Sequence, residues 1–192
     1  VYNNLIELDS DKMPVSELAE SWEVSPDAKE WVFNLRKGVV FHNGKEFDAN
    51  DVIYSINLHR GKDTKSSAKP LVSIIDDIVA ETPNQVRFKL SSSNAEFLYS
   101  LADFALVMVP DGFTDWNHAI GTGGYQIEHW EAGVKSTLKR NENYWKPDRA
   151  WVDSVDLISI TDSAARLAAI RSGEVHVIDR VQARLAKQLE AA

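Results

Sequence analysis

Apolar residues at every second position predict strands along much of the chain. Trp31, Phe33 and Leu35 alternate with polar neighbours, which is typical of a strand that buries one face. A turn at residues 25–27 precedes this strand, because proline fixes φ and aspartate hydrogen-bonds its own backbone, so we expect a hairpin. Other strands are expected, from alternation or from a short apolar run, at residues 74–79, 86–90, 105–109, 125–127, 135–140, 155–160 and 175–178. The first two of these are expected to be joined around Pro83-Asn84, and those at 125–127 and 135–140 to form a hairpin around Gly133.

Apolar residues three or four positions apart predict the helices. Asp48 lies where a helix N-cap belongs and Asp51 follows three residues later, so a helix is expected to begin there and to end near Gly61. The Asn43-Gly44 pair before it tolerates positive φ and predicts a short hairpin. Further helices are expected at residues 14–22, where a short helix would run into a strand, at 95–102, at 164–172 with Gly173 closing it, and from Val181 onward.

Helices and strands follow one another in mixed order without an internal repeat, so the sequence predicts an α+β fold. Residues 62–70 are polar and irregular. The 192 residues are 44% hydrophobic and 26% charged, which gives room for one sizeable core or two small ones and argues against disorder.

Charge and cysteine content narrow the chemistry. The formal net charge of −8 argues against a nucleic-acid partner, because such a surface cannot neutralise phosphates, and it is typical of a solvated surface. The chain contains no cysteine, which excludes disulfides, thiolate metal sites and a cysteine nucleophile but does not fix the compartment. No apolar run is long enough to span a bilayer, and the first residues lack the features of a signal peptide, so any targeting segment is expected to have been removed or never included.

Signatures of catalysis and of cofactor binding are missing. The sequence has no nucleophile elbow, zinc-protease motif, Walker loop or dinucleotide fingerprint. Residues 121–124 (Gly-Thr-Gly-Gly) lack the lysine of a phosphate cradle and precede a strand, so they are interpreted as a tight turn. The five histidines have no metal-ligand spacing. We therefore expect no catalytic residue, no metal site and no cofactor, and the protein is not expected to be an enzyme.

Several distinctive blocks are spread over nearly the whole chain. They are Glu17-Leu18-Ala19-Glu20-Ser21-Trp22, Leu35-Arg36-Lys37-Gly38-Val39, Phe41-His42-Asn43-Gly44-Lys45, Phe47-Asp48-Ala49-Asn50-Asp51-Val52, Ile120-Gly121-Thr122-Gly123-Gly124-Tyr125, Leu138-Lys139-Arg140-Asn141-Glu142-Asn143-Tyr144-Trp145 and Ala165-Arg166-Leu167-Ala168-Ala169-Ile170-Arg171-Ser172-Gly173-Glu174-Val175. In this order and with plausible gaps, the blocks resemble those of the peptide/nickel-binding family of extracytoplasmic solute-binding proteins, family 5. One departure is Gly124, where the family usually has proline; glycine should keep the turn and loosen it.

The resemblance implies part of lobe one of a bilobal, type II periplasmic-binding-protein fold, with mixed sheets and flanking helices. Residues 1–119 would form the small subdomain of this lobe and residues 120–192 part of its larger subdomain, with the second lobe absent from this chain. The implied function is that of the substrate-binding component of an ABC importer, which captures peptides or a related small solute in the periplasm and delivers it to the permease subunits. Nucleic-acid binding and direct membrane insertion are not implied.

Polar residues without a structural reason mark the candidate ligand surface. Lys65 and Ser67 lie in the irregular segment, and Asp103 and Phe104 follow the helix predicted at residues 95–102. In the family the corresponding stretches resemble segments that face the cleft, so these four residues are the expected ligand-binding residues. A solute receptor that signals to a partner remains an alternative function, and an unrecognised hydrolase is a weaker one.

Overall fold

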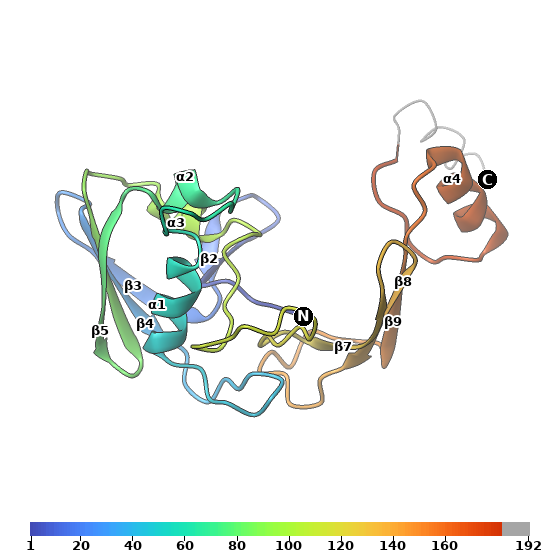
Figure 1. Cartoon of the computed structure of the whole chain (residues 1–192), viewed down its shortest axis with the longest axis horizontal. Coiled ribbons are helices and arrows are strands. Elements are labelled where there is room, and N and C mark those ends of the chain that lie inside the picture. The colour runs from blue at the N-terminus through green and yellow to red at the C-terminus, as the bar shows by residue number, and fades with distance from the viewer. Residues whose placement is uncertain (182–192) are drawn as a thin grey trace. The chain divides into compact units, whose positions relative to one another are not determined.

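The computed structural model describes residues 1–181, which fall into two compact units (Figure 1). The first unit comprises Val1–Ile127 and Lys139–Ser154, and the second comprises Glu128–Leu138 and the chain from Val155 onward. Each unit contains both strands and a helix, so the predicted α+β class is confirmed. The predicted subdomain boundary after residue 119 concerns the lobe of a complete protein and stays a prediction.

A four-stranded antiparallel sheet forms the framework of the first unit. Its order is β3-β4-β6-β5, so two hairpins lie side by side with β4 and β6 in the middle. Both predicted hairpins, around residues 25–27 and 83–84, are therefore confirmed. The strands span Ala19–Val24 (β3), Glu30–Leu35 (β4), Ile75–Thr82 (β5) and Gln85–Leu90 (β6).

The inward face of the two central strands carries the core of this unit. Trp31 lies opposite Phe88, and Phe33 lies opposite Val86. All four side chains are at most 3% exposed. The rings of Phe33 and Phe88 meet edge to face, with centroids 5.4 Å apart, which adds a specific contact to the apolar area removed from water. The alternation in the sequence thus fixes which face of the sheet is buried.

Helix α1 (Ala49–Asn57) packs against β5 and β6 and begins where predicted. The Asp48 carboxylate accepts hydrogen bonds from two backbone N–H groups of the first turn, and the Asp51 carboxylate accepts one from Asp48 N–H at 2.8 Å. This reciprocal pair completes the predicted capping box. The helix ends four residues before Gly61, because residues 59 and 60 continue only as tight turns.

The helix predicted at residues 14–22 is wrong. Pro14–Ser16 form β2, which pairs with β1 (Ile6–Leu8) in a two-stranded sheet, and the chain then enters β3. Of the apolar residues at helical spacing, Val15 therefore lies in β2, Leu18 in the break between the strands, and Ala19 and Trp22 in β3. A register shift at the start of β3 adds to the irregular spacing. A short window of sequence cannot distinguish this arrangement from one helical face.

Residues 105–109 are largely buried, as predicted, but the expected strand is wrong. Leu106, Met108 and Val109 are at most 1% exposed. Instead of pairing with a strand, Val109 N–H donates to Ser55 Oγ (2.9 Å), and the Ser55 hydroxyl donates to Val109 O (3.1 Å). The Ser55 side chain thus satisfies both the N–H and the C=O of the buried Val109. The segment therefore does not need a neighbouring strand as a hydrogen-bond partner at this residue.

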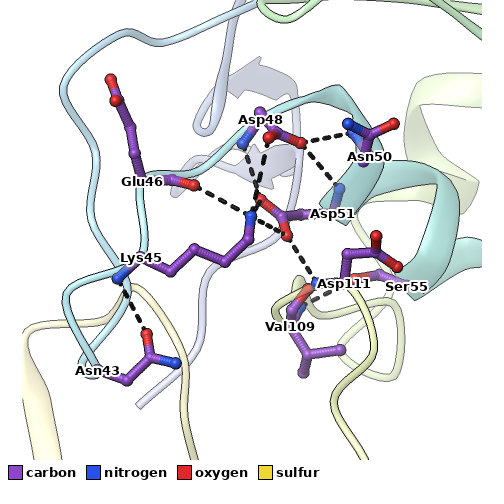
Figure 2. Close-up of polar contacts among 9 residues, drawn as sticks. All are labelled: Asn43, Lys45, Glu46, Asp48, Asn50, Asp51, Ser55, Val109 and Asp111. Carbon is purple, nitrogen blue, oxygen red and sulfur yellow. Dashed lines mark hydrogen bonds and ion pairs between the residues drawn. The ribbon is translucent and has the colours of Figure 1, made fainter.

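Asp51 joins α1 to two other segments, as Figure 2 shows. Lys45 Nζ lies 2.6 and 2.7 Å from its two carboxylate oxygens, and Asp111 N–H donates to Oδ1 at 2.7 Å. The Asp51 side chain is 0% exposed. Burial raises the pKa of the Asp51 carboxyl, against the opposing effect of the bonds from Lys45, Asp111 and Asp48. A buried carboxylate needs such partners, so this lysine has a structural role.

Gly121 and Gly123 make room for the first residues of the chain. A methyl group on Gly121 would lie 2.4 Å from Val1 O, and one on Gly123 would lie 2.5 Å from the same atom. Gly123 N–H instead donates to Val1 O at 2.7 Å. Neither glycine has a positive φ. The chain does bend here, but close backbone approach, and not the conformational demand of a tight turn, requires glycine.

Both ring nitrogens of His42 form hydrogen bonds with the segment that contains Gly121 and Gly123. Nε2 lies 2.9 Å from Gly123 O, and Gly121 N–H donates to Nδ1 at 3.4 Å. Only a neutral ring with its proton on Nε2 can make both bonds, because a protonated Nδ1 cannot accept. Burial lowers the pKa of His42, which favours this neutral form.

Two short helices complete the first unit. α3 (Phe97–Leu101) is the centre of the helix predicted at residues 95–102 and buries Phe97 and Leu101. α2 (Lys69–Val72) begins near the end of the segment predicted to be irregular, and proline occupies its first turn. Residues 62–68 between α1 and α2 form turns and irregular backbone, as predicted.

A three-stranded sheet of order β7-β8-β9 contains the later strands. These are Tyr125–Glu131 (β7), Lys135–Arg140 (β8) and Ser154–Ile158 (β9). Gly133, with φ of 73°, lies in the turn between the first two, so the hairpin predicted there is confirmed.

Helix α4 (Ser163–Ser172) is confirmed, with Gly173 at φ 77° ending it. The strand predicted at residues 175–178 is wrong. No strand among residues 1–181 pairs with this segment, so its backbone has no partner for the hydrogen bonds of a sheet. The helix predicted from Val181 onward falls almost wholly outside the described residues. Within the described part of the chain, no helix combines the length and the apolar character needed to cross a membrane.

Replacement of Lys45 by alanine is expected to lower the free energy of unfolding by about 2 kcal/mol, because the buried Asp51 carboxylate loses its counter-charge. Urea denaturation followed by circular dichroism measures the change. Lys89→Ala is the control, since Lys89 is exposed and forms no ion pair within residues 1–181. Equal losses in the two variants would contradict the role of the pair.

Acid is expected to weaken the fold through His42. Because burial lowers its folded-state pKa, the unfolded chain takes up a proton first. The stabilisation is therefore complete above the unfolded pKa of about 6.5 and is lost as the pH falls through the folded pKa. Urea titrations between about pH 7.5 and 5 should show that His42→Gln reduces this loss to the part that comes from His59, whose pKa burial also lowers, whereas His129→Gln, at an exposed position, keeps all of it.

Candidate functional site

The four predicted ligand-binding residues lie on two segments of the first unit. Lys65 and Ser67 are exposed in the loop between α1 and α2, while Asp103 and Phe104 form the turn that follows α3. Phe104 is 85% exposed, and Trp116 and Trp151 of the same unit are also exposed. Asp103 is half-buried.

His59 and Ser66 hold the loop between α1 and α2 in place. Ser66 Oγ lies 2.6 Å from His59 Nδ1, and the same hydroxyl oxygen accepts a hydrogen bond from Ala68 N–H (3.1 Å). The hydroxyl hydrogen is therefore free to donate to Nδ1. His59 also feels the charge of Asp103, which raises its pKa, although burial has the larger effect and the pKa of His59 is lowered overall. The loop that carries Lys65 and Ser67 is thus anchored to a ring close to Asp103.

Backbone contacts hold Asp103 in one conformation. Its Oδ1 accepts a hydrogen bond from Ala105 N–H at 2.9 Å, which is an Asx turn. Its main-chain oxygen accepts bonds from Leu106 N–H (2.9 Å) and Asn4 Nδ2 (2.6 Å). The first residues of the chain, the end of α3 and the irregular segment after it therefore meet at this aspartate.

Sequence reasoning missed three residues of this arrangement: Asn4, His59 and Ser66. Each bonds a residue of this cluster, but none belongs to a recognisable motif. His59 lies just beyond the last turn of α1 and could have been singled out as a titratable group at a helix end. Only the folded structure shows that the charge of Asp103, 44 residues further along the chain, raises the pKa of His59.

The Ser66, His59 and Asp103 set does not make a nucleophile triad. A triad requires the acid to hydrogen-bond the second ring nitrogen of histidine. Asp103 bonds Ala105 N–H and acts on His59 only through its charge. Among residues 1–181 no group of three or more His, Asp or Glu side chains is placed to hold a metal ion.

Two open hollows of the first unit lie elsewhere. One of about 700 Å³ is lined by Arg36, Trp145 and their neighbours, and one of about 690 Å³ lies beside Pro26 and Lys89. Neither contains any of the four predicted ligand-binding residues. Both are open to solvent. The second is lined mostly by charged side chains, whereas in the first Arg36 and Lys146 are partly buried and lie over the ring of Trp145.

The family comparison matches residues 13–192 to "Bacterial extracellular solute-binding proteins, family 5 Middle". A di/tripeptide-binding protein from Pseudomonas aeruginosa is 29% identical over 191 residues, covering 83% of this chain and 35% of that protein. The solved structure of the periplasmic binding protein AgaA from A. tumefaciens R10, in complex with agropinic acid, superposes with a TM-score of 0.94 at 30% identity. The periplasmic protein DppA from Helicobacter pylori, in complex with the peptide STSA, superposes with a TM-score of 0.87 at 28% identity.

Both structural matches cover the whole of this chain, but only 40% and 43% of those proteins. The chain thus spans well under half the length of the relatives that it matches. The high TM-scores confirm that its fold is part of a periplasmic-binding-protein fold, as the resemblance implied.

The Asp103→Asn substitution is expected to lower the pKa of His59 further, because the Asp103 charge raises that pKa against burial. A pH titration of the imidazole resonances by NMR measures the shift. Asp111→Asn is the control, since Asp111 is exposed and has no effect on His59. If the pKa of His59 stays the same in the Asp103 variant, the two side chains are not neighbours.

Proposed function

The chain belongs to the bacterial extracellular solute-binding proteins of family 5, and from this premise we propose that the complete protein is the capture component of an ABC importer. It binds peptides or a related small solute outside the cytoplasmic membrane and delivers it to the permease subunits. The match of the family model to residues 13–192 carries this proposal. It is supported by relatives whose names specify di- and tripeptides, and by a neighbour solved with a bound peptide.

The ligand-binding surface of this chain is proposed to be the loop and turn described above. Lys65 and Ser67 present a cation and a hydroxyl, while Asp103 and Phe104 present an anion and an exposed ring. Together they offer one partner for each kind of group found in a small peptide: carboxylate, amide, ammonium and apolar side chain. We place them on the wall of the ligand cleft contributed by lobe one, with residues 1–119 and 120–192 in its two subdomains.

Ligand capture by such a protein does not require catalysis. Binding needs a closed conformation that has greater affinity for the solute than the open one, because only that difference drives closure. The closed form is then the one that the permease subunits recognise. The proposal includes no turnover of the solute, consistent with the arrangement of Ser66, His59 and Asp103. A periplasmic location follows from the same family membership.

Native mass spectrometry of the complete protein, purified without denaturation, tests the function. The expected result is a bound solute of small mass that is released intact when the protein is unfolded and that competes with added peptides. Incubation with the same peptides over hours should leave them unchanged. Hydrolysis of the added peptides at a rate proportional to the protein concentration would overturn the proposal in favour of an enzyme.

A further inference from the structure

The sulfur chemistry of this chain is confined to two methionines, because the sequence contains no cysteine. Their surroundings differ. Met13 is 54% exposed, whereas Met108 is 0% exposed and belongs to the core of the first unit. Oxidation of a thioether requires that the oxidant reach the sulfur, so it follows exposure. Met13 is therefore the thioether that a peroxide in the solvent reaches without opening the fold.

The turn between β1 and β2 holds the backbone of Met13 in one conformation. Asp9 Oδ1 accepts hydrogen bonds from the N–H groups of Asp11 and Met13, both at 2.9 Å. The N–H of Asp9 donates to Met13 O at 3.0 Å. The aspartate thus closes the turn through its side chain and its main chain together. The methionine side chain consequently projects from a fixed point of the first unit.

Tyr99 of α3 lies beside the methionine sulfur. Its hydroxyl donates to Met13 Sδ over a distance of 3.8 Å, although the two residues are 86 positions apart in the sequence. A thioether sulfur is a weak acceptor, so this bond contributes little in the reduced protein. Oxidation would make the side chain polar and place a strong acceptor, the sulfoxide oxygen, on the same sulfur. The distance leaves room for that oxygen to accept an O–H···O bond of normal length, about 2.7 Å.

We propose that Met13 is a site of reversible oxidation to methionine sulfoxide, and that the Tyr99 hydroxyl binds the sulfoxide oxygen. The inference goes beyond solute capture and is independent of the solute that the complete protein binds. The buried Met108 is excluded from this chemistry while the protein is folded, because a sulfoxide there would place a polar group in the core.

The oxidant is a peroxide and the reductant is a dithiol. A lone pair of Sδ attacks one oxygen of hydrogen peroxide, so that an S–O bond forms and the O–O bond breaks. The departing hydroxide takes the proton of the transferred hydroxyl group and leaves as water. Sulfur loses two electrons, which the peroxide gains. In the reverse direction a dithiol is oxidised to a disulfide, and the sulfoxide oxygen leaves as water.

The modification would join the β1–β2 turn more firmly to α3. This helix packs against β1, and Tyr99 is its central residue. In the reduced protein the side-chain bond between the turn and the helix is a weak O–H···S bond, which oxidation would replace by an O–H···O bond. Because Met13 is exposed, its oxidation adds a polar group at the surface and leaves the core of the first unit intact.

Treatment of the folded, complete protein with hydrogen peroxide, followed by peptide mapping with mass spectrometry, tests the site. The peptide that contains Met13 should gain one oxygen at least about 10-fold faster than the peptide that contains Met108, because a buried thioether reacts only when the core opens. Methionine sulfoxide reductases for both epimers should remove this oxygen in the presence of a dithiol. Equal rates for the two methionines, or a Met13 that stays unoxidised in the folded protein, would overturn the inference.

Thermal melting before and after oxidation tests the role of Tyr99. The Tyr99→Phe substitution keeps the ring and removes the hydroxyl, so oxidation should lower the melting temperature of this variant more than that of the unchanged protein. Met13→Leu is the control, since any effect of peroxide that remains in it comes from other residues. After subtraction of that effect, an equal shift in Tyr99→Phe and in the unchanged protein would show that the hydroxyl does not bind the sulfoxide. Either result leaves the capture function standing.

Discussion

The ion pair between Lys45 and the fully buried Asp51 is the contact on which the order of the first unit depends. One carboxylate closes the capping box of α1, takes both bonds of the lysine and accepts the N–H of Asp111. Removal from water makes an unpaired carboxylate costly, so the three partners must stay together. The start of the helix, the Asn43-Gly44 loop and the segment after α3 are consequently fixed relative to one another.

Helix α1 also helps to position the candidate ligand surface, through the irregular segment at residues 105–111. The segment that follows Asp103 has no strand of its own, and side chains of α1 satisfy its backbone: Ser55 at Val109 and Asp51 at Asp111. The turn that presents Asp103 and Phe104 is therefore positioned by a helix, although it belongs to no regular element. A binding surface made of irregular chain but held by a helix combines a fixed geometry with sequence freedom at its exposed positions.

A second junction holds the first residues of the chain in the same unit. Gly121 and Gly123 leave space for Val1, and a neutral His42 bonds both glycines. The side-chain amide of Asn4, three residues after Val1, donates a hydrogen bond to the main-chain oxygen of Asp103. The sequence blocks that identify the family serve largely as structural contacts of this kind, whereas the proposed ligand residues lie outside them. Family membership is thus easier to recognise than the solute.

The sequence alone determined the elements whose signals are local. Alternation gave the hairpins of the four-stranded sheet, and the Asp48 and Asp51 pair gave the start of α1, because period and capping depend only on near neighbours. It failed at residues 14–22 and 105–109. At residues 14–22 the strands β2 and β3 pair with β1 and β4, which are near in sequence, but strands this short leave no clear period. At residues 105–109 the bonds to Ser55, 54 residues away, decided the backbone. Of the candidate site, Asp103 and Phe104 could be proposed from the sequence. The approach of His59 and Asn4 to that aspartate arises only in the tertiary structure, since no local pattern records which segments meet.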